Sequence, residues 1–180
     1  VMRNIKPQNN FLKKIRDLID QKKIILIFDE CTSGFRETYG GIYKKFNITP
    51  DLLILGKALG NGYAINAVLG KKNIMKNSEK CFISSTFWTE RAGPTAAIST
   101  LTEMNKIKSW KIISKKGLYI KKKWKELFIK HSLSVEISGL NSICSFTFKN
   151  HHLKYRTYIT QEMLKIGYLC TTTVYLCIDH

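Results

Sequence analysis

The chain has 180 residues, of which 44% are hydrophobic and 24% charged, and these proportions exclude a wholly disordered chain. Its longest apolar run, residues 24–28, is too short to cross a bilayer, and no charged-then-apolar leader opens the sequence. We therefore expect a cytoplasmic protein with no membrane partner. The sequence begins and ends within what reads as continuous structure, so we also expect it to be a piece of a longer protein.

The net charge of +17 comes from 30 Lys and Arg against 13 Asp and Glu. The lysines are spread along the chain and Arg is scarce, which favours a solvated surface over the clustered, Arg-rich surface of a nucleic-acid binder. We predict no nucleic-acid partner, with a basic nucleic-acid-binding domain as the alternative. The five Cys and four His follow no common zinc or disulfide spacing, so we predict reduced thiols and no metal.

The first part of the chain alternates helix-like and strand-like segments. Apolar residues recur at helical spacing over 9–22, and short apolar runs predict strands at 24–28, 52–55 and 64–69. The run at 24–28 is continuously apolar, which is typical of a strand buried on both faces of a parallel sheet between helices. This pattern predicts an open α/β sheet.

The second part of the chain predicts a small α+β unit attached through helices. An Ala- and Thr-rich segment predicts a helix over 92–106, and a 3–4-residue apolar period predicts a second one over 110–130. Further segments alternate between strand and helix patterns. Strands are expected at 134–138, 142–148 and 171–178, and a helix at 155–166.

Two charged residues follow predicted strands, at the places where open α/β sheets bind ligands. Asp29 comes directly after the first strand, and Lys57 comes two residues after the second. Each of them alone has an ordinary explanation, as a turn or cap residue and as a surface lysine. A charge at the end of a buried strand is costly without a partner, so together they predict a binding site.

Three motifs surround these residues. The first motif is Asp29-Glu30-Cys31-Thr32-Ser33-Gly34-Phe35-Arg36. The second is Pro50-Asp51-Leu52-Leu53-Ile54-Leu55-Gly56-Lys57-Ala58-Leu59-Gly60-Asn61-Gly62. The third is Ser84-Ser85-Thr86-Phe87-Trp88-Thr89-Glu90 followed by Gly93-Pro94-Thr95-Ala96-Ala97. In this order, the motifs resemble the class III pyridoxal-phosphate-dependent aminotransferases, a family that includes glutamate-1-semialdehyde 2,1-aminomutase.

The resemblance covers most of residues 5–101 and continues more loosely to the end. It implies α/β architecture, namely the fold-type I pyridoxal-phosphate-dependent transferase fold. Residues 1–108 would be the C-terminal part of the large, mostly parallel-sheet cofactor domain. Residues 109–180 would be the connecting helix and an incomplete small C-terminal α+β domain.

The resemblance also implies roles for four residues around the cofactor, pyridoxal 5'-phosphate. Lys57 is the catalytic lysine that holds the cofactor as a Schiff base, and its place at a strand end favours partial desolvation and the neutral amine. Asp29 pairs with the protonated ring nitrogen. Cys31 packs on the ring face, where the family commonly has an aliphatic residue. Thr86 donates a hydroxyl to the cofactor phosphate of a neighbouring subunit, which implies a homodimer with shared active sites.

The implied activity is amino-group transfer between a small-molecule amino donor and a carbonyl acceptor. An aminomutase-type isomerase and an inactive truncated remnant are the alternatives, because all three share this lysine and aspartate. The sequence leaves the roles of three further residues undecided. Glu30 either braces the site or forms a surface salt bridge, and Arg36 and Arg91 either attract a substrate carboxylate or are structural.

Overall fold

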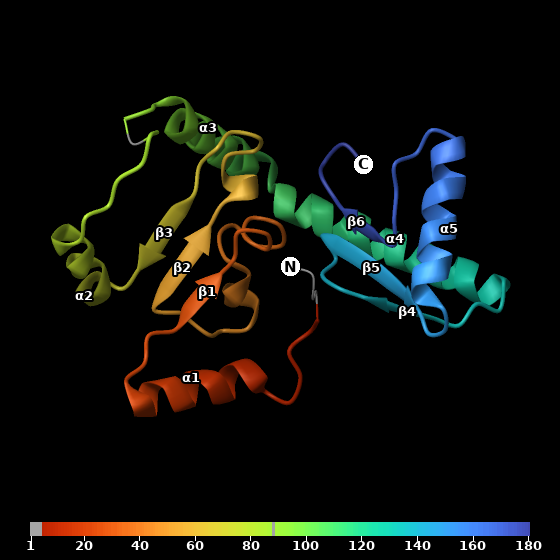
Figure 1. The fold of residues 1–180 in the computed structure, drawn as a ribbon, viewed down its shortest axis with the longest axis horizontal. Helices are drawn as coiled ribbons and strands as arrows, with labels where there is room; N and C mark the ends of the chain where they lie inside the picture. The colour runs from red at the N-terminus through yellow and green to blue at the C-terminus, as the bar shows by residue number, and fades with distance from the viewer. Residues whose placement is uncertain (1–4, 88) are drawn as a thin grey trace. The chain divides into compact units, whose positions relative to one another are not determined.

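A computed structural model describes residues 5–87 and 89–180 of the chain. These residues form two compact units (Figure 1). One unit is Pro7–Trp110, and the other contains Lys111–His180 together with residues 5 and 6. Their assignment to the two domains expected at 1–108 and 109–180 stays a prediction.

The first unit contains a three-stranded sheet in the order β1 (Ile27–Asp29), β2 (Leu52–Leu55) and β3 (Ala67–Gly70), whose strands lie side by side in Figure 1. β1 runs parallel to β2 with Asp29 opposite Ile54, whereas β3 is antiparallel to β2. Because β1 and β2 are parallel, their carboxyl ends meet at one edge of the sheet. The chain leaves β2 there through Gly56 and enters a short 3-10 helix, η2 (Lys57–Leu59).

The two long helices of the first unit agree with the sequence pattern. α1 (Phe11–Lys22) and α3 (Ala92–Ile107) match the predicted helices within two residues at each end. The sequence did not predict the short elements, because a single turn carries too little apolar periodicity to be recognised. These are α2 (Lys72–Met75), η1 (Ile42–Lys45) and η3 (Lys76–Lys80).

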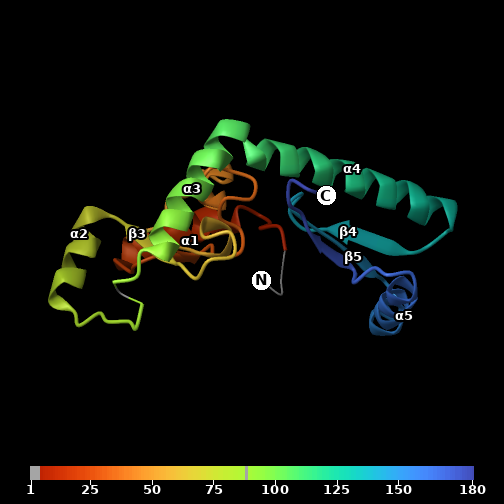
Figure 2. The same cartoon turned by 90° about the horizontal axis from the view of Figure 1, so that it is seen from above.

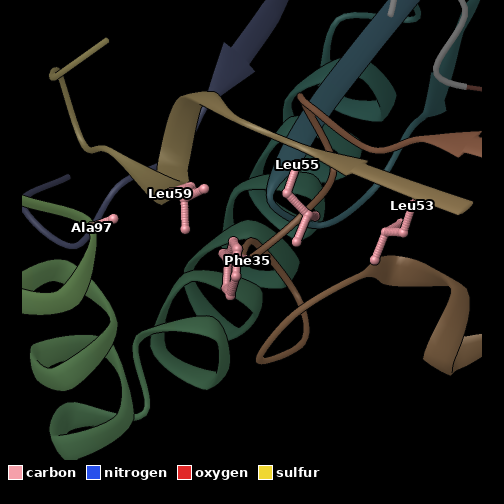
Figure 3. Packing of buried hydrophobic residues seen from close by; sticks show 5 residues of the cluster. All are labelled: Phe35, Leu53, Leu55, Leu59 and Ala97. Atoms are coloured by element: carbon pink, nitrogen blue, oxygen red, sulfur yellow. The ribbon is translucent and has the colours of Figure 1, made fainter. Parts of the chain in front are cut away.

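The core of this unit lies between the sheet and α3. Figure 3 shows its five buried side chains, which come from β2, from η2, from α3 and from the loop after β1. They are Phe35, Leu53, Leu55, Leu59 and Ala97. The core therefore packs directly beneath the carboxyl edge of β1 and β2 and fixes the backbone that carries Lys57.

The first strand differs from its prediction in position and burial. It begins at Ile27 instead of Ile24, because Ile24 donates its N–H to the Ile19 carbonyl and so completes the end of α1. At its other end the strand extends one residue further than predicted, so Asp29 is its last residue. Within residues 5–87 and 89–180, β1 pairs with a strand on one side only, and Ile25 and Ile27 are half exposed while Leu26 is buried, so the expected burial on both faces is not found among these residues.

The second unit is an antiparallel sheet packed on a long helix. The strands follow the order β4 (Val135–Ser138), β5 (Ile143–Phe148) and β6 (Thr173–Tyr175). α4 (Ser109–Lys130) runs along one face of the sheet in Figure 2, and α5 (His152–Lys165) follows β5. The predicted elements are confirmed, although β6 is shorter than expected. No helix within 5–87 or 89–180 combines the length and the hydropathy needed to span a membrane.

Close approach between α4 and the loop before β5 depends on Gly117. A Cβ atom on Gly117 would overlap the backbone carbonyl of Asn141, and the same loop is held by Lys121, whose Nζ donates to Gly139 O at 2.5 Å. The neighbouring Cys144 is fully buried, and its thiol donates to Asn141 O at 3.0 Å. Gly117 therefore sets the distance between helix and sheet.

We expect Gly117→Ala to destabilise the protein by about 2 kcal/mol or more, although alanine usually favours a helix by up to about 1 kcal/mol over glycine. The reason is that the added methyl group meets backbone, which cannot rotate away. Urea unfolding measures the change, with Lys115→Ala on the exposed face of the same helix as control. An equal or greater stability for Gly117→Ala would contradict the packing described above.

Asp51 joins four elements of the first unit through one buried carboxylate. Its oxygens accept hydrogen bonds from Leu26 N at 2.8 Å and from Arg16 of α1 at 3.0 Å, and Lys71 after β3 lies 2.6 Å away. Burial raises the pKa of Asp51, but the Leu26 hydrogen bond and the two cations outweigh burial and hold that pKa at about 2. The ionised carboxylate is therefore part of the folded structure.

We expect Asp51→Asn to lower the free energy of unfolding by about 2–3 kcal/mol at neutral pH, because both cations lose their anionic partner. The ionised carboxylate stabilises the fold above about pH 4, and this contribution of about 2 kcal/mol is lost as the pH falls from 3.8 toward 2. Urea unfolding across this range measures both effects. The control is Asp20→Asn, which removes only the exposed partner of Arg16. Equal acid sensitivity of the protein and Asp51→Asn would refute this assignment.

Candidate active site

The carboxyl edge of β1 and β2 brings together the two residues singled out in the sequence. Asp29 ends β1, and Lys57 begins η2 directly after Gly56. The strand pairing places Asp29 opposite Ile54, three residues before Lys57. The two side chains are close enough for the charge of Lys57 to lower the pKa of Asp29. The expectation that they share one site is therefore consistent with the structure.

Asp29 carries a carboxylate that is set up to stay ionised. Hydrogen bonds from the Cys31 backbone and thiol lower the pKa of Asp29, and the Cys31 N–H lies 3.1 Å from Oδ1. The charge of Lys57 adds to this effect, while partial burial opposes it. Such a carboxylate can accept a hydrogen bond from, and stabilise, a cationic nitrogen of a ligand.

Lys57 is exposed, so the desolvation expected from its place at a strand end is wrong for this chain. Its Nζ donates a hydrogen bond of 2.6 Å to the hydroxyl of Thr32, which is buried. Its backbone has a φ of 44°, in the left-handed region that a lysine seldom occupies. The amine is thus accessible to a ligand while its direction is set by a neighbour 25 residues away.

Cys31 and Gly56 lie close to each other beside these two residues. A Cβ atom on Gly56 would lie 3.3 Å from the Cys31 sulfur and would collide with the Asn66 side-chain oxygen. Burial raises the pKa of the Cys31 thiol, and Asp29 raises it further, so the thiol stays protonated at neutral pH and serves as a small, polarizable surface. Glycine at position 56 therefore lets the turn pack tightly against Asn66 and Cys31, where any side chain would collide.

Glu30 lies behind the site and clamps the loop that follows β1. Its carboxylate is 3% exposed and accepts backbone N–H groups from Ile42 and from Tyr43, the latter at 3.0 Å, together with the hydroxyl of Ser33. Burial raises the pKa of Glu30, against the lowering effect of these donors. Of the two roles considered for Glu30, the surface salt bridge is wrong and bracing of the loop is what the contacts describe.

The remaining sequence candidates lie outside this group of contacts. Thr86 is exposed, in the segment between η3 and α3, and Arg91 is exposed at the start of α3. Arg36 is half-buried and donates from Nε to the Thr32 carbonyl at 2.6 Å, which is a structural contact. Within the part of the chain that the structure describes, no three His, Cys, Asp or Glu residues gather as a metal site would require.

Thr32 is the residue of this site that sequence reasoning missed. It stands inside the first motif, three residues after Asp29, but its side chain meets Lys57 only because β1 and β2 pair in one register. The sequence did offer one signal for Thr32, because its hydroxyl stands in the same motif as the candidate carboxylate of Asp29. Asn66, which faces Gly56, carried no comparable signal in the sequence.

The site residues fit pyridoxal phosphate. The ionised Asp29 suits a protonated ring nitrogen, and the accessible Lys57 amine suits an aldehyde carbon. Asp29, Cys31 and Lys57 are the residues that would hold this group.

Comparison with known proteins identifies the family. The family model described as aminotransferase class-III matches residues 4–176, so the chain belongs to the class III aminotransferases. A 3-aminobutyryl-CoA aminotransferase of Cloacimonas acidaminovorans (strain Evry) is 36% identical over 178 residues, covering 91% of this chain and 43% of that protein. A glutamate-1-semialdehyde 2,1-aminomutase of Nitrosopumilus maritimus (strain SCM1) is 42% identical over 114 residues, covering 62% of this chain and 27% of that protein. The chain thus spans less than half the length of these relatives.

Solved structures confirm the fold-type I assignment. The FumI protein of Sphingopyxis sp. MTA144, in its PLP internal aldimine form, matches with a TM-score of 0.84 at 23% identity, over 91% of this chain and 40% of that one. An omega-transaminase from Sphaerobacter thermophilus matches with a TM-score of 0.83 at 21% identity, over 97% of this chain and 44% of that one. Membership of the class III aminotransferases supports pyridoxal phosphate as the cofactor.

We expect Glu30→Ala to open the loop after β1 locally, because two backbone N–H groups lose their acceptor at a cost of about 2–4 kcal/mol. Amide hydrogen exchange at Ile42 and Tyr43 should become at least about tenfold faster. Glu103→Ala, on the exposed side of α3, is the control and should leave this exchange unchanged. Unchanged exchange in Glu30→Ala would show that the carboxylate does not clamp the loop.

Proposed function

We propose that the protein containing this chain transfers amino groups between a small-molecule amino donor and a carbonyl acceptor, with pyridoxal phosphate as cofactor. The observation that carries the proposal is the placement of the Asp29 carboxylate and the Lys57 amine at one strand edge, each within electrostatic reach of the other. Membership of the class III aminotransferases supports it independently.

In this proposal, Lys57 is the catalytic residue and Asp29 and Cys31 bind the cofactor. The cofactor, when bound, withdraws electrons from the substrate carbon that loses and gains a proton. The Lys57 amine would hold the cofactor covalently and, when free, would move the proton at that carbon. With the cofactor bound, the ionised Asp29 would keep the ring nitrogen protonated, and Cys31 would support the ring face.

Thr86 belongs to a second part of the proposal, in which two subunits share each site. Its exposed position before α3 leaves its hydroxyl accessible to another chain, and its motif resembles the segment that contacts the cofactor phosphate of a neighbouring subunit in the family. A homodimer with shared active sites is therefore the proposed working unit, and the cytoplasm is its proposed location.

An aminomutase is the second candidate function. It is favoured by the glutamate-1-semialdehyde 2,1-aminomutase of Nitrosopumilus maritimus, which is 42% identical over its matched part. An aminomutase rearranges one substrate and needs no separate carbonyl acceptor, whereas an aminotransferase does. Product formation from a single substrate in the absence of any acceptor would therefore favour the aminomutase.

We expect Lys57→Ala to abolish covalent retention of pyridoxal phosphate and to lower amino transfer by at least about a thousandfold, because both the attachment and the proton transfer lose their amine. Visible absorbance after gel filtration and transfer rates measure the two effects, in the longest natural polypeptide that contains these residues. Lys72→Ala, an exposed lysine on α2, is the matched control. Retention of the visible band by Lys57→Ala would refute the assignment of Lys57.

A further inference from the structure

The Lys57 amine donates a hydrogen bond of 2.6 Å to the Thr32 hydroxyl and so links the turn after β2 to the loop after β1. Thr32 is 5% exposed, whereas Lys57 is exposed. A β-branched side chain has a stiff χ1 angle, while a lysine has a flexible four-carbon stem. Thr32 is therefore the fixed partner of this pair, and Lys57 is the one whose position the bond selects.

The backbone of Thr32 is itself held in place by neighbouring residues. The Thr32 carbonyl accepts a hydrogen bond of 2.6 Å from Nε of Arg36, one turn further along the same loop. Two residues earlier, the buried Glu30 ties the loop to the backbone of Ile42 and Tyr43. The hydroxyl thus occupies a place that is set without any contribution from Lys57.

The backbone of Lys57 is restrained as well. Its φ of 44° is a strained conformation for a residue with a Cβ, and such strain persists only where surrounding contacts enforce it. Here Leu59 N–H and Asn61 N–H close the turn on Gly56 and Lys57, respectively, at 3.0 Å each. The lysine is consequently held at both ends, by the turn at its backbone and by Thr32 at its amine.

We propose that Thr32 is a positioning residue for Lys57, whose amine it holds at the strand edge shared with Asp29 before the cofactor binds. The role of the held amine in cofactor capture rests on the function proposed above. Fixing a lysine side chain in advance lowers the entropy lost when the amine meets its target, so capture is faster than with a freely rotating lysine. A merely structural threonine would instead be replaced by valine without effect on the amine.

The test compares Thr32→Val, which keeps the shape and removes the hydroxyl, with Thr32→Ser, which keeps the hydroxyl. Lysines of the cofactor-free chain are methylated with formaldehyde and cyanoborohydride, and mass spectrometry follows each lysine separately. We expect the rate at Lys57, relative to the other lysines, to rise about threefold or more in Thr32→Val, because the amine is released from its hydrogen bond and a small aldehyde, unlike the cofactor, needs no fixed direction of approach. In Thr32→Ser, the relative rate should stay within about twofold of the parent.

Lys45 reports whether the loop itself has loosened, since it pairs with the buried Glu37 in the same loop region. A faster reaction at Lys57 alone, reversed by serine, supports the proposal. Equal rates at Lys57 in the parent and Thr32→Val would overturn it, and so would a rise at both Lys45 and Lys57.

A second measurement separates this inference from the proposed function. Pyridoxal phosphate is added to each chain and trapped on lysines with borohydride, and we expect its capture by Lys57 to be about threefold slower in Thr32→Val than in Thr32→Ser. Absence of capture by Lys57 in the parent would refute the proposed function. The methylation rates, measured without cofactor, would still decide whether Thr32 holds the amine.

Discussion

The buried carboxylate of Asp51 is the interaction on which the first unit depends. It lies where the chain enters β2, and it joins this strand to α1 through Arg16, to the start of β1 through Leu26 and to the end of β3 through Lys71. A carboxylate with these partners tolerates no shift of β1 along β2, because any other register would separate it from Leu26 N–H. Since Asp29 and Lys57 come from these two strands, the same register determines how close they lie.

The site thus combines a rigid backbone framework with the accessible amine of Lys57. Asp29 and Thr32 are positioned by strand pairing and by a loop that Glu30 and Arg36 hold from behind. Lys57 extends from a turn whose geometry is fixed by the core residue Leu59. Rigid surroundings matter for a cofactor enzyme, because the protein contributes the orientation of the reactive groups and the cofactor contributes the electron withdrawal.

Sequence reasoning recovered the parts of this structure that local chemistry determines. Long apolar periods located α1 and α4, and an Ala- and Thr-rich composition located α3. The rule that parallel strands bind ligands at their carboxyl ends singled out Asp29 and Lys57, which lie at the same edge of the sheet. It misplaced the start of β1, because Ile24 belongs to an apolar run and yet completes a helix. It could not assign Glu30 or find the contact of Thr32 with Lys57, since those hydrogen bonds join residues 12 to 25 positions apart and depend on the packed loop.

The left-handed backbone of Lys57 has a consequence for how this position can change. Glycine or asparagine would occupy that conformation at lower cost, so selection for thermal stability alone would remove the lysine. A lysine in this conformation lowers the free energy of unfolding, and the proposed function gives a reason for keeping the amine at this position. Replacing Lys57 with glycine or asparagine to relax this turn would therefore remove the amine on which the proposed function depends.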